Sequence, residues 1–563
     1  MPAMLLLTIQ ETISTVLNQK VMSDTELKKV IVLWSLLIVS KTLFEPFVSF
    51  YRIHLNEKIL EKLNIKIMKK INSFYSLELF ENSQIYCEIQ FIKEEAKSKP
   101  LNFVYVFSGC LQSGISLCSI LMVLFFLVWW LPILIIIALI PYAISIVLRE
   151  KKSWDLNLFN HSDVHRMHNI SQITCDYRAA KELRLFGFGD FLIKKYTKLS
   201  KAFQKKMHIG RKKLFWKSSV YSLLHAIMEG AIFILILCCV KVQLFDVAVL
   251  AVLLQALIIS NRESEIFFQS VGLFTHSIKF FEKYRKFLNR SENFYNAPKN
   301  TISSTLKGPL TFSNVSFYYS DERIALQSIN LSIESGEKIA VVGENGSGKS
   351  TLVKLLCRLY DPQIGEIKMG NTNIKDIDIT KWRNSLSAVF QDFGQYQMTV
   401  FENIGIGNIE ACRLRDQVKS AAKKGGIYNI SSQLPQHLHT LLGKEFGGTD
   451  LSYGEWQRIA LARAFMRNAD ILILDEPTAA IDIEQERKIF DTFDQFCKNK
   501  TALLITHRLS AIPYVDRIIF MQKGRILEQG SHLELLKLGG EYAKLYELSK
   551  IYQTTPKNQL SNL

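Results

Sequence analysis

The chain has 563 residues, of which 48% are hydrophobic and 21% charged, and its formal net charge is +17. Apolar and aromatic residues are too abundant for a disordered protein. Nine scattered cysteines without a CxxC pair exclude a disulfide scaffold and fit a reducing compartment. The mean hydropathy of +0.10 is high for a soluble protein of this length and predicts surface that faces lipid.

The first apolar segments predict an incomplete membrane crossing followed by a complete one. Residues 1–17 are too short to span a bilayer and carry Gln10 and Glu11, without the basic start of a signal peptide. A full crossing is expected over about 30–51. Because the crossing over 30–51 must run from the outside back to the cytosol, we expect residues 1–17 to be the outer end of a first crossing whose beginning is missing.

The segment Leu101–Leu148 contains no Asp, Glu, Lys or Arg. As a helix its 48 residues would be about 72 Å long, whereas one crossing needs about 30 Å, so we expect two crossings. The aromatic pair Trp129–Trp130 and Pro132 predict the turn between them. A second hairpin is expected at Ser218–Val240 and Val247–Phe268. Buried helices of a soluble core are the alternative, but such a core rarely provides so long an uncharged run.

The positive charge is concentrated between the two hairpins. Residues 149–217 hold 17 Lys or Arg and 6 Asp or Glu, a net charge of 17 − 6 = +11. Because Lys and Arg accumulate in cytosolic loops, we expect this segment, residues 52–99 and everything after about residue 279 to be cytosolic. Nucleic-acid binding is the alternative, but topology already explains the charge, so no nucleic-acid partner is expected.

A few charged residues fall inside the predicted crossings. Glu229 lies in an otherwise apolar crossing, and Arg262, Glu263 and Glu265 cluster in the last one. Charges in a membrane are costly and usually face a pore or a partner. Arg262 and Glu265 are three residues apart and could pair with each other, or the acidic residues could contact a cationic cargo; the sequence leaves both open.

The pattern changes near residue 310, where short apolar runs alternate with glycine-rich turns and helical stretches. Strands are expected at Ile339–Val342, Ile471–Leu474, Ala502–Ile505 and Ile518–Met521. This alternation predicts an α/β domain with a parallel core sheet. The expected division is a helical transmembrane bundle at 1–285, a polar linker at 286–309, an α/β P-loop domain at 310–550 and a tail at 551–563.

A phosphate-binding loop follows the first of these strands. The segment matches GxxxxGK[ST] between a strand and a helix, with backbone N–H groups that can surround phosphate oxygens. The expected ATP-binding residues are Gly343, Glu344, Asn345, Gly346, Ser347, Gly348, Lys349, Ser350 and Thr351. Lys349 is expected to reach the β- and γ-phosphates, and Ser350 to reach Mg²⁺.

Two carboxylates end the strand Ile471–Leu474. Asp475 is expected beside the P-loop, where it can hold Mg²⁺, and Glu476 is expected to polarise the attacking water. Two acids at a strand end could instead form a solvated turn, but the P-loop favours the catalytic interpretation.

The segment Leu451-Ser-Tyr-Gly-Glu455 resembles the signature loop of ATP-binding cassette (ABC) transporters, and the C-terminal half and the helical layout are similar to exporter half-transporters of that family. The resemblance implies six crossings and an ATPase that uses ATP and Mg²⁺. It also implies a role for each matching residue: Tyr319 stacks on adenine, with Tyr318 as the fallback. Gln391 contacts Mg²⁺, His507 senses the γ-phosphate, Asp482 crosses the dimer, and Ser452 and Gly454 contact the γ-phosphate on the other subunit.

The signature departs from the family pattern at two positions. Tyr453 replaces the usual glycine and Glu455 the usual glutamine, while Ser452 and Gly454 remain, so we expect function with an altered rate. The segment 443–450 matches the family's membrane-coupling loop only loosely. Because Glu476 is intact, a homodimer would have two competent sites; a heterodimer remains an alternative.

The cargo is suggested by the run Lys181-Glu-Leu-Arg-Leu-Phe-Gly187, which is similar to a segment of lantibiotic and bacteriocin exporters and falls where exporters place a coupling helix. The resemblance therefore implies export of a ribosomally made peptide across the bacterial cell membrane. Multidrug or lipid export is the main alternative, and import or a nucleic-acid-dependent ATPase the lesser ones.

Overall fold

The computed structural model describes residues 8, 13, 24–159, 161–177, 179–242, 247–290, 308–319, 323–478 and 481–554. It divides into two compact units, one of Met1–Phe74 with Leu79–Ser291 and one of Tyr75–Glu78 with Glu292–Leu563. Nearly all of the expected incomplete crossing at 1–17, most of the predicted linker at 286–309 and most of the tail at 551–563 lie outside the described residues.

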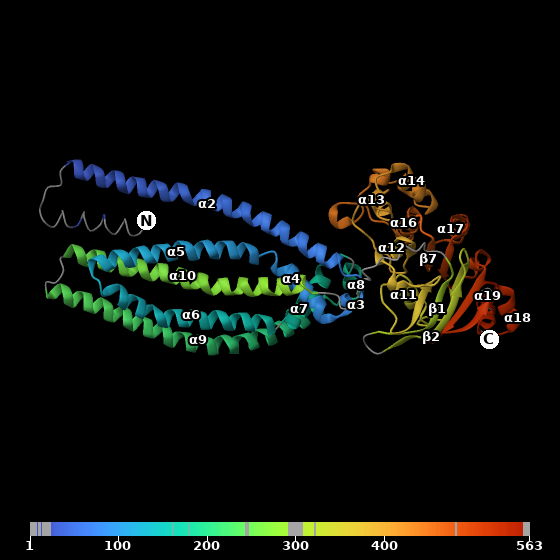
Figure 1. Cartoon of the computed structure of the whole chain (residues 1–563), viewed down its shortest axis with the longest axis horizontal. Coiled ribbons are helices and arrows are strands. Elements are labelled where there is room, and N and C mark those ends of the chain that lie inside the picture. The colour runs from blue at the N-terminus through green and yellow to red at the C-terminus, as the bar shows by residue number, and fades with distance from the viewer. Residues whose placement is uncertain are drawn as a thin grey trace. The chain divides into compact units, whose positions relative to one another are not determined.

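The described part of the first unit is helical. Its elements are α2 (Asp24–Asn72), α3 (Glu78–Glu81, whose first residue belongs to the second unit), α4 (Ser83–Glu95), α5 (Lys99–Leu127), α6 (Leu131–Phe159), α7 (His161–Cys175), α8 (Ala180–Leu185), α9 (Gly189–Lys241) and α10 (Val247–Leu288). Helices α5, α6, α9 and α10 run alongside one another as a long bundle (Figure 1).

The two predicted turns lie between helices. Helix α5 ends at Leu127 and α6 begins at Leu131, so the uncharged 48-residue segment forms two helices as expected. Helix α9 ends at Lys241 and α10 begins at Val247. The sequence Lys181–Gly187 contains the short helix α8.

Three helices in the described part of the chain are long and apolar enough to cross a membrane, namely Lys99–Leu127, Leu131–Arg149 and Gly189–Lys241. The crossings expected over 30–51 and 247–268 fall on α2 and α10, which are helical but are not among those three. These two crossings therefore remain predictions.

The helical unit keeps a narrow apolar core and exposes many other apolar side chains. Ile120, Leu124 and Ile236 are completely buried where α5, α6, α9 and α10 meet. In contrast, the side chain of Phe126 is 77% exposed and that of Val220 is 65% exposed. Apolar surface of this extent is costly in water and is suited to contact with lipid or with another membrane chain.

The second unit contains two sheets. The larger has the order β10-β9-β3-β8-β7-β6, in which β6, β7, β8, β3 and β9 are parallel and β10 is antiparallel to β9. Its strands are β3 (Lys338–Val342), β6 (Leu386–Val389), β7 (Ile471–Asp475), β8 (Thr501–Ile505), β9 (Arg517–Gln522) and β10 (Arg525–Gly530). The four predicted strands are β3, β7, β8 and β9, and the parallel sheet is as expected.

The smaller sheet is antiparallel, with the order β2-β1-β4-β5, and was not predicted. Its strands are β1 (Leu310–Tyr318), β2 (Ile324–Ile333), β4 (Ile364–Met369) and β5 (Thr372–Asn373). Strand β2 alternates between buried and exposed residues, which is typical of a sheet covered on one face.

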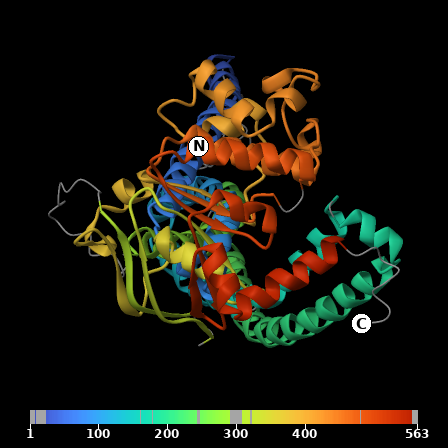
Figure 2. The same cartoon turned by 90° about the vertical axis from the view of Figure 1, so that its right-hand side faces the viewer.

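The helices of this unit are α11 (Lys349–Leu356), α12 (Ile379–Asn384), α13 (Val400–Gly405), α14 (Arg415–Lys424), α15 (Tyr428–Ser431), α16 (Tyr453–Met466), α17 (Ile483–Phe496), α18 (His532–Leu538) and α19 (Glu541–Thr554). Helices α13, α14 and α16 share an apolar cluster with Val400, Val418 and Ile459 at its centre. These orange helices are grouped apart from the yellow-green strands β1 and β2 in both views (Figures 1 and 2).

Four residues, Tyr75–Glu78, belong to the second unit although they are distant in sequence from the rest of it, Glu292–Leu563. The Leu77 N–H donates to the Leu359 carbonyl (3.1 Å), and Arg383 Nη2 donates to the Tyr75 carbonyl (2.8 Å). Leu77 also packs against the apolar core of this unit. These four residues are thus part of the second unit although they follow α2 in the sequence, which sequence spacing did not indicate.

Candidate nucleotide-binding site

The phosphate-binding loop begins where β3 ends, and its shape requires glycine at two positions. Gly343 has φ = 148°, and a Cβ there would lie 2.0 Å from the Met521 carbonyl oxygen. Gly348 has φ = 103°, and a Cβ there would lie 2.7 Å from the Ala325 carbonyl oxygen. Larger residues are excluded at both positions because the loop lies against neighbouring backbone.

Lys349 is the first residue of α11 and its side chain folds into this loop. Its Nζ donates to the carbonyls of Gly343 (2.7 Å) and Glu344 (2.8 Å). Burial lowers the pKa of Lys349, while Glu476 and Asp475 act in the opposite direction. The ammonium group is therefore placed at the centre of the loop, at the start of a helix whose N–H groups also favour an anion.

Asp475 ends β7 and is 3% exposed. Burial raises the pKa of Asp475 to about 6, with a smaller contribution in the same direction from Glu476; a hydrogen bond with the Ser350 side chain opposes the shift. The described residues contain no cluster of three or more His, Cys, Asp or Glu side chains that could hold a metal ion. A hydroxyl, a carboxylate and phosphate oxygens are the hard oxygen ligands that Mg²⁺ prefers, so Ser350 and Asp475 fit this ion.

Glu476 follows with a strained backbone, since its φ of 50° is unusual for a residue with a side chain. Gln391 Nε2 donates to its Oε2 (3.1 Å), and His507 Nε2 lies 3.3 Å from its Oε1. The Gln457 Nε2 donates to the Glu476 backbone carbonyl (2.9 Å). The carboxylate is thus held between the side chains of Gln391 and His507.

The ring of His507 is half-buried. Burial lowers the pKa of His507, the charge of Lys349 lowers it further, and Glu476 acts in the opposite direction. The lowered pKa favours the neutral ring at pH 7, which can donate one hydrogen bond and accept another.

Tyr319 lies just beyond β1, near the P-loop helix. Its Oη is 3.1 Å from Thr351 Oγ1, and its ring meets the rings of Phe317 and Tyr360 edge-on at 5.0 and 5.8 Å. Tyr318, in contrast, exchanges two backbone hydrogen bonds with the Gln363 side chain. The role of Tyr319 as the residue that stacks on adenine stays a prediction.

Ser452 caps the N-terminus of α16, as expected, and Gly454 lies in the first turn. Glu455 closes a capping box, because its Oε2 accepts from the Ser452 backbone N–H (2.7 Å) and from Ser452 Oγ (2.8 Å). Among the residues described, no hydrogen bond joins Ser452 or Gly454 to the P-loop of the same chain. The two groups are thus separate within one chain.

Two further contacts connect the signature helix with its surroundings. The Tyr453 Oη donates to the Gln391 carbonyl (3.3 Å), and its ring lies 5.2 Å from that of Phe393. Asp482 caps α17 and lies 3.8 Å from Arg458. Sequence reasoning missed Gln457 and Arg458, although both follow the signature on a predicted helix, because helical spacing alone does not show which turn faces Glu476 or Asp482.

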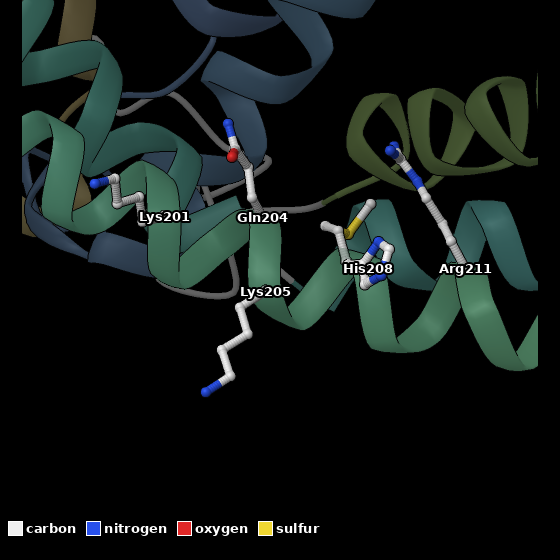
Figure 3. Close-up of a pocket in the computed structure, with 6 residues that line it drawn as sticks. Lys201, Gln204, Lys205, His208 and Arg211 are labelled. Carbon is white, nitrogen blue, oxygen red and sulfur yellow. The ribbon is translucent and has the colours of Figure 1, made fainter.

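A pocket outside the nucleotide site belongs to the helical unit and has a volume of about 580 Å³ (Figure 3). Its lining comes from one stretch of α9, with Lys201, Gln204, Lys205, Met207, His208 and Arg211. This stretch lies in the basic segment whose charge was predicted to be cytosolic, and it holds none of the nucleotide-site residues.

Comparisons with known proteins relate the chain to one family. Residues 326–479 match the family model described as ABC transporter. The chain is 31% identical to the subtilin transport ATP-binding protein SpaT of Bacillus subtilis, over 89% of this chain and 81% of that protein. It is 29% identical to the nisin transport ATP-binding protein NisT of Lactococcus lactis subsp. lactis, over 95% and 89%.

Other similarities are shorter or structural. An ATP-dependent lipid A-core flippase of Hahella chejuensis is 44% identical, but over only 44% of this chain and 42% of that protein. The solved structure of a bacterial Atm1-family ABC exporter with ATP bound has the same fold, with a TM-score of 0.82 over 99% of this chain and 96% of that one, at 22% identity.

The fold and the matched residues define an ATP-driven membrane transporter in which membrane helices and the ATP-binding domain share one chain. The chain belongs to the ABC transporter family, as an exporter-type half-transporter similar to lantibiotic exporters. It binds ATP and couples its hydrolysis to transport.

Proposed function

We propose that this transporter exports a ribosomally made peptide of the lantibiotic or bacteriocin kind across the bacterial cell membrane. The observation that carries the proposal is the extent of similarity. The subtilin and nisin transport proteins match 89% and 95% of the chain, whereas the lipid A-core flippase matches 44%. Cargo passes through the membrane helices, so similarity that extends over both halves bears on cargo more than similarity limited to part of the chain.

ATP is proposed to bind with its phosphates in the loop from Gly343 to Thr351. Lys349 and the helix N–H groups would hold the β- and γ-phosphates, and Tyr319 would stack on the adenine. Glu476 would orient and deprotonate the attacking water, because it is the carboxylate beside the loop that two side chains hold in place. His507 would donate a hydrogen bond to the γ-phosphate. Gln391 would turn toward the nucleotide, and its hydrogen bond to Glu476 would then break.

Ser350, Asp475 and Gln391 are proposed to hold Mg²⁺, which would neutralise charge on the phosphates when bound. The carboxylate of Asp475 must be ionised for this task. Its pKa of about 6 leaves it mostly ionised at pH 7 even before a cation adds its own attraction.

Two copies are proposed to act together, with Ser452, Gly454 and Asp482 completing the site of the partner subunit. The support is that Ser452 and Gly454 make no hydrogen bond with their own P-loop among the described residues, while Ser452 presents a helix N-terminus suited to phosphate. ATP must bind more tightly to one conformation of the transporter than to the other, because equal binding to both would not shift the equilibrium between them.

Lipid export is the second candidate, because the flippase similarity reaches 44% identity in the region it covers. The cytosolic placement of the ATP-binding unit follows from the same topology that explains the +11 segment.

The test is ATPase activity of the purified chain in lipid nanodiscs, alone and with cationic leader-bearing peptides, hydrophobic drugs or lipids, with Glu476→Gln as the blank. Stimulation by peptides alone supports peptide export. Stimulation by lipids or drugs but not by peptides overturns it. Basal activity no higher than that of the blank overturns the homodimer and calls for a second, different subunit.

A further inference from the structure

Two ionisable side chains face each other inside the apolar part of α9. His225 Nε2 lies 3.3 Å from Glu229 Oε1, one helical turn away, and the side chains are 14% and 25% exposed. The other ring nitrogen, Nδ1, lies 2.7 Å from the carbonyl oxygen of Ala138 on α6. Ionisable groups at this depth are costly and are kept for a function.

These distances determine how many protons the pair holds. A carbonyl oxygen can only accept, so Nδ1 must carry a hydrogen. In a neutral ring Nε2 is then a bare acceptor, and it would face a carboxylate oxygen that is also an acceptor. The repulsion disappears if one extra proton lies on Nε2 or on the Glu229 carboxyl group. The geometry therefore favours a pair that shares one extra proton, compared with a neutral histidine ring and an ionised carboxylate.

The surroundings of the pair come from two other helices. The Tyr142 ring on α6 lies 5.1 Å from the His225 ring, and Phe268 on α10 meets Tyr142 edge-on at 6.2 Å. Glu265 and Arg149 are the charged groups near Tyr142, and Gln269 hydrogen-bonds to it.

Glu265 accepts a hydrogen bond from the neutral amide of Gln269 on its own helix, at 2.9 Å. No ion pair joins Glu265 to Arg262 in the part of the chain described, so the pairing considered from the sequence is absent there. Glu229 has only the shared proton as its counter-charge among these contacts. Glu265 is exposed, whereas the Glu229 side chain is 25% exposed, so a cation paired with Glu229 is screened less by solvent.

We propose that the His225–Glu229 pair is a binding site where a hydrophobic organic cation of the cargo replaces the shared proton. The cation forms an ion pair with Glu229, the proton leaves to solvent, and the charge of the site is unchanged. Aromatic rings such as that of Tyr142 attract a cation over their faces. The lysine of a peptide and a small lipophilic cation share this chemistry. The inference deepens the proposed function by naming the part of the cargo that the membrane helices bind.

The test uses the full chain in nanodiscs and two probes, tetraphenylphosphonium and a hydrophobic peptide with one lysine, with the lysine-acetylated peptide as the neutral counterpart. Binding is measured by equilibrium dialysis from pH 6 to pH 9. One proton competing with one cation makes the wild-type affinity rise by up to roughly tenfold per pH unit. Glu229→Gln is expected to weaken binding at least tenfold and to remove the pH dependence.

Two further variants keep the result interpretable. Glu263→Gln, which removes a carboxylate of the same membrane region on α10, is the matched control and should bind within twofold of the wild type. His225→Asn keeps a donor for the Ala138 carbonyl and leaves Glu229 as the only proton acceptor of the pair, so it should still bind the cation. Basal ATPase activity reports that each variant is folded.

Three results overturn the proposal: binding by Glu229→Gln equal to that of the wild type, a wild-type affinity that does not change with pH, or no binding of either cation. Binding of tetraphenylphosphonium but not of the lysine peptide assigns the site to small cations, and the reverse assigns it to peptides. If the cation site behaves as expected but no peptide stimulates ATPase activity, peptide export fails while the site stands. If peptides stimulate Glu229→Gln as well as the wild type, peptide export stands and the site fails.

Discussion

The ATP-binding unit and the membrane unit assemble their polar groups in different ways. In the former, each group lies at the end of a strand or the start of a helix, as Asp475 does after β7 and Lys349 at the start of α11. Parallel strands end at one edge, so residues far apart in sequence converge there. In the membrane unit, His225 and Glu229 are on one helix, but the Ala138 carbonyl that fixes the hydrogen on His225 Nδ1 comes from a neighbouring helix. Strand ends therefore reveal a site in the sequence, and helix faces do not.

The two units also treat apolar residues differently. Every residue of β7 and β8 is buried. Long stretches of α5 and α9 instead expose large apolar side chains, with Phe126 at 77%. The hydrophobic effect drives the first arrangement, whereas in lipid the helices associate by packing and by a few polar contacts. Substitutions in the ATP-binding unit should therefore have the larger effects on activity and stability, and these effects should be more local.

The largest effect is expected from Glu476→Gln. It keeps the size of the side chain and removes the general base, which typically contributes 10²–10⁴-fold. Phosphate release should fall at least about 100-fold while a fluorescent ATP analogue still binds. The control is Glu484→Gln, an exposed acid on α17. Activity within tenfold of the wild type would mean that another group activates the water.

The buried carboxylate of Asp475 should appear as a pH-dependent stability. Its pKa is raised to about 6, so the folded nucleotide-free protein binds this proton more tightly than the unfolded chain. Stability from this group is present at low pH and is lost as the pH rises from about 4 to 6. Asp475→Asn should therefore melt at a higher temperature than the wild type at pH 7.5, and the difference should shrink toward pH 4. A difference that does not vary with pH contradicts the assignment.

Arg383 tests the role of the Tyr75–Glu78 segment in ATPase activity. Arg383→Gln removes the guanidinium that donates to the Tyr75 carbonyl. We expect the peptide-stimulated part of the ATPase activity to fall severalfold and the basal part to stay within about twofold, because the nucleotide site itself is intact. Lys381→Gln, on the same short helix, is the control. An equal loss of basal and stimulated activity would indicate simple misfolding of α12.

Glu455 tests the unusual signature. Its carboxylate occupies the N–H and hydroxyl of Ser452, the groups proposed to meet the γ-phosphate of the partner subunit's nucleotide. Glu455→Gln keeps an amide oxygen for the cap and removes a like charge, so ATPase activity should rise about two- to fivefold. The control is Glu534→Gln, which alters the equivalent capping box of Ser531 on α18. A decrease in activity would assign the carboxylate a productive role.

The smallest effect is expected from Tyr453→Phe. The change removes the hydrogen bond to the Gln391 carbonyl and keeps the ring beside Phe393. Because this bond is long and exposed, we expect activity within about twofold of the wild type, measured by phosphate release. A larger loss would show that the signature helix and Gln391 move together through this contact.

Much of the ATP-binding unit was predictable from sequence. The four expected strands, the P-loop and a helix after it occur as predicted. The antiparallel sheet β2-β1-β4-β5 was missed because its strands lack the buried apolar runs that mark β7 and β8. The roles of the site residues remain predictions that the variants above test.

The sequence alone determined the features that depend on local periodicity and composition: the uncharged helical hairpin, the phosphate loop between strand and helix, and the charge of the segment between the hairpins. These follow because backbone geometry and burial act over a few residues. Only the tertiary structure decided that Gln391 and His507 hold Glu476, that Tyr75–Glu78 joins the α/β unit, and that His225 lies between Glu229 and a carbonyl of α6. Apart from the His225–Glu229 pair, which lies one helical turn apart, each of these contacts joins segments whose separation along the chain carries no information about their distance in space.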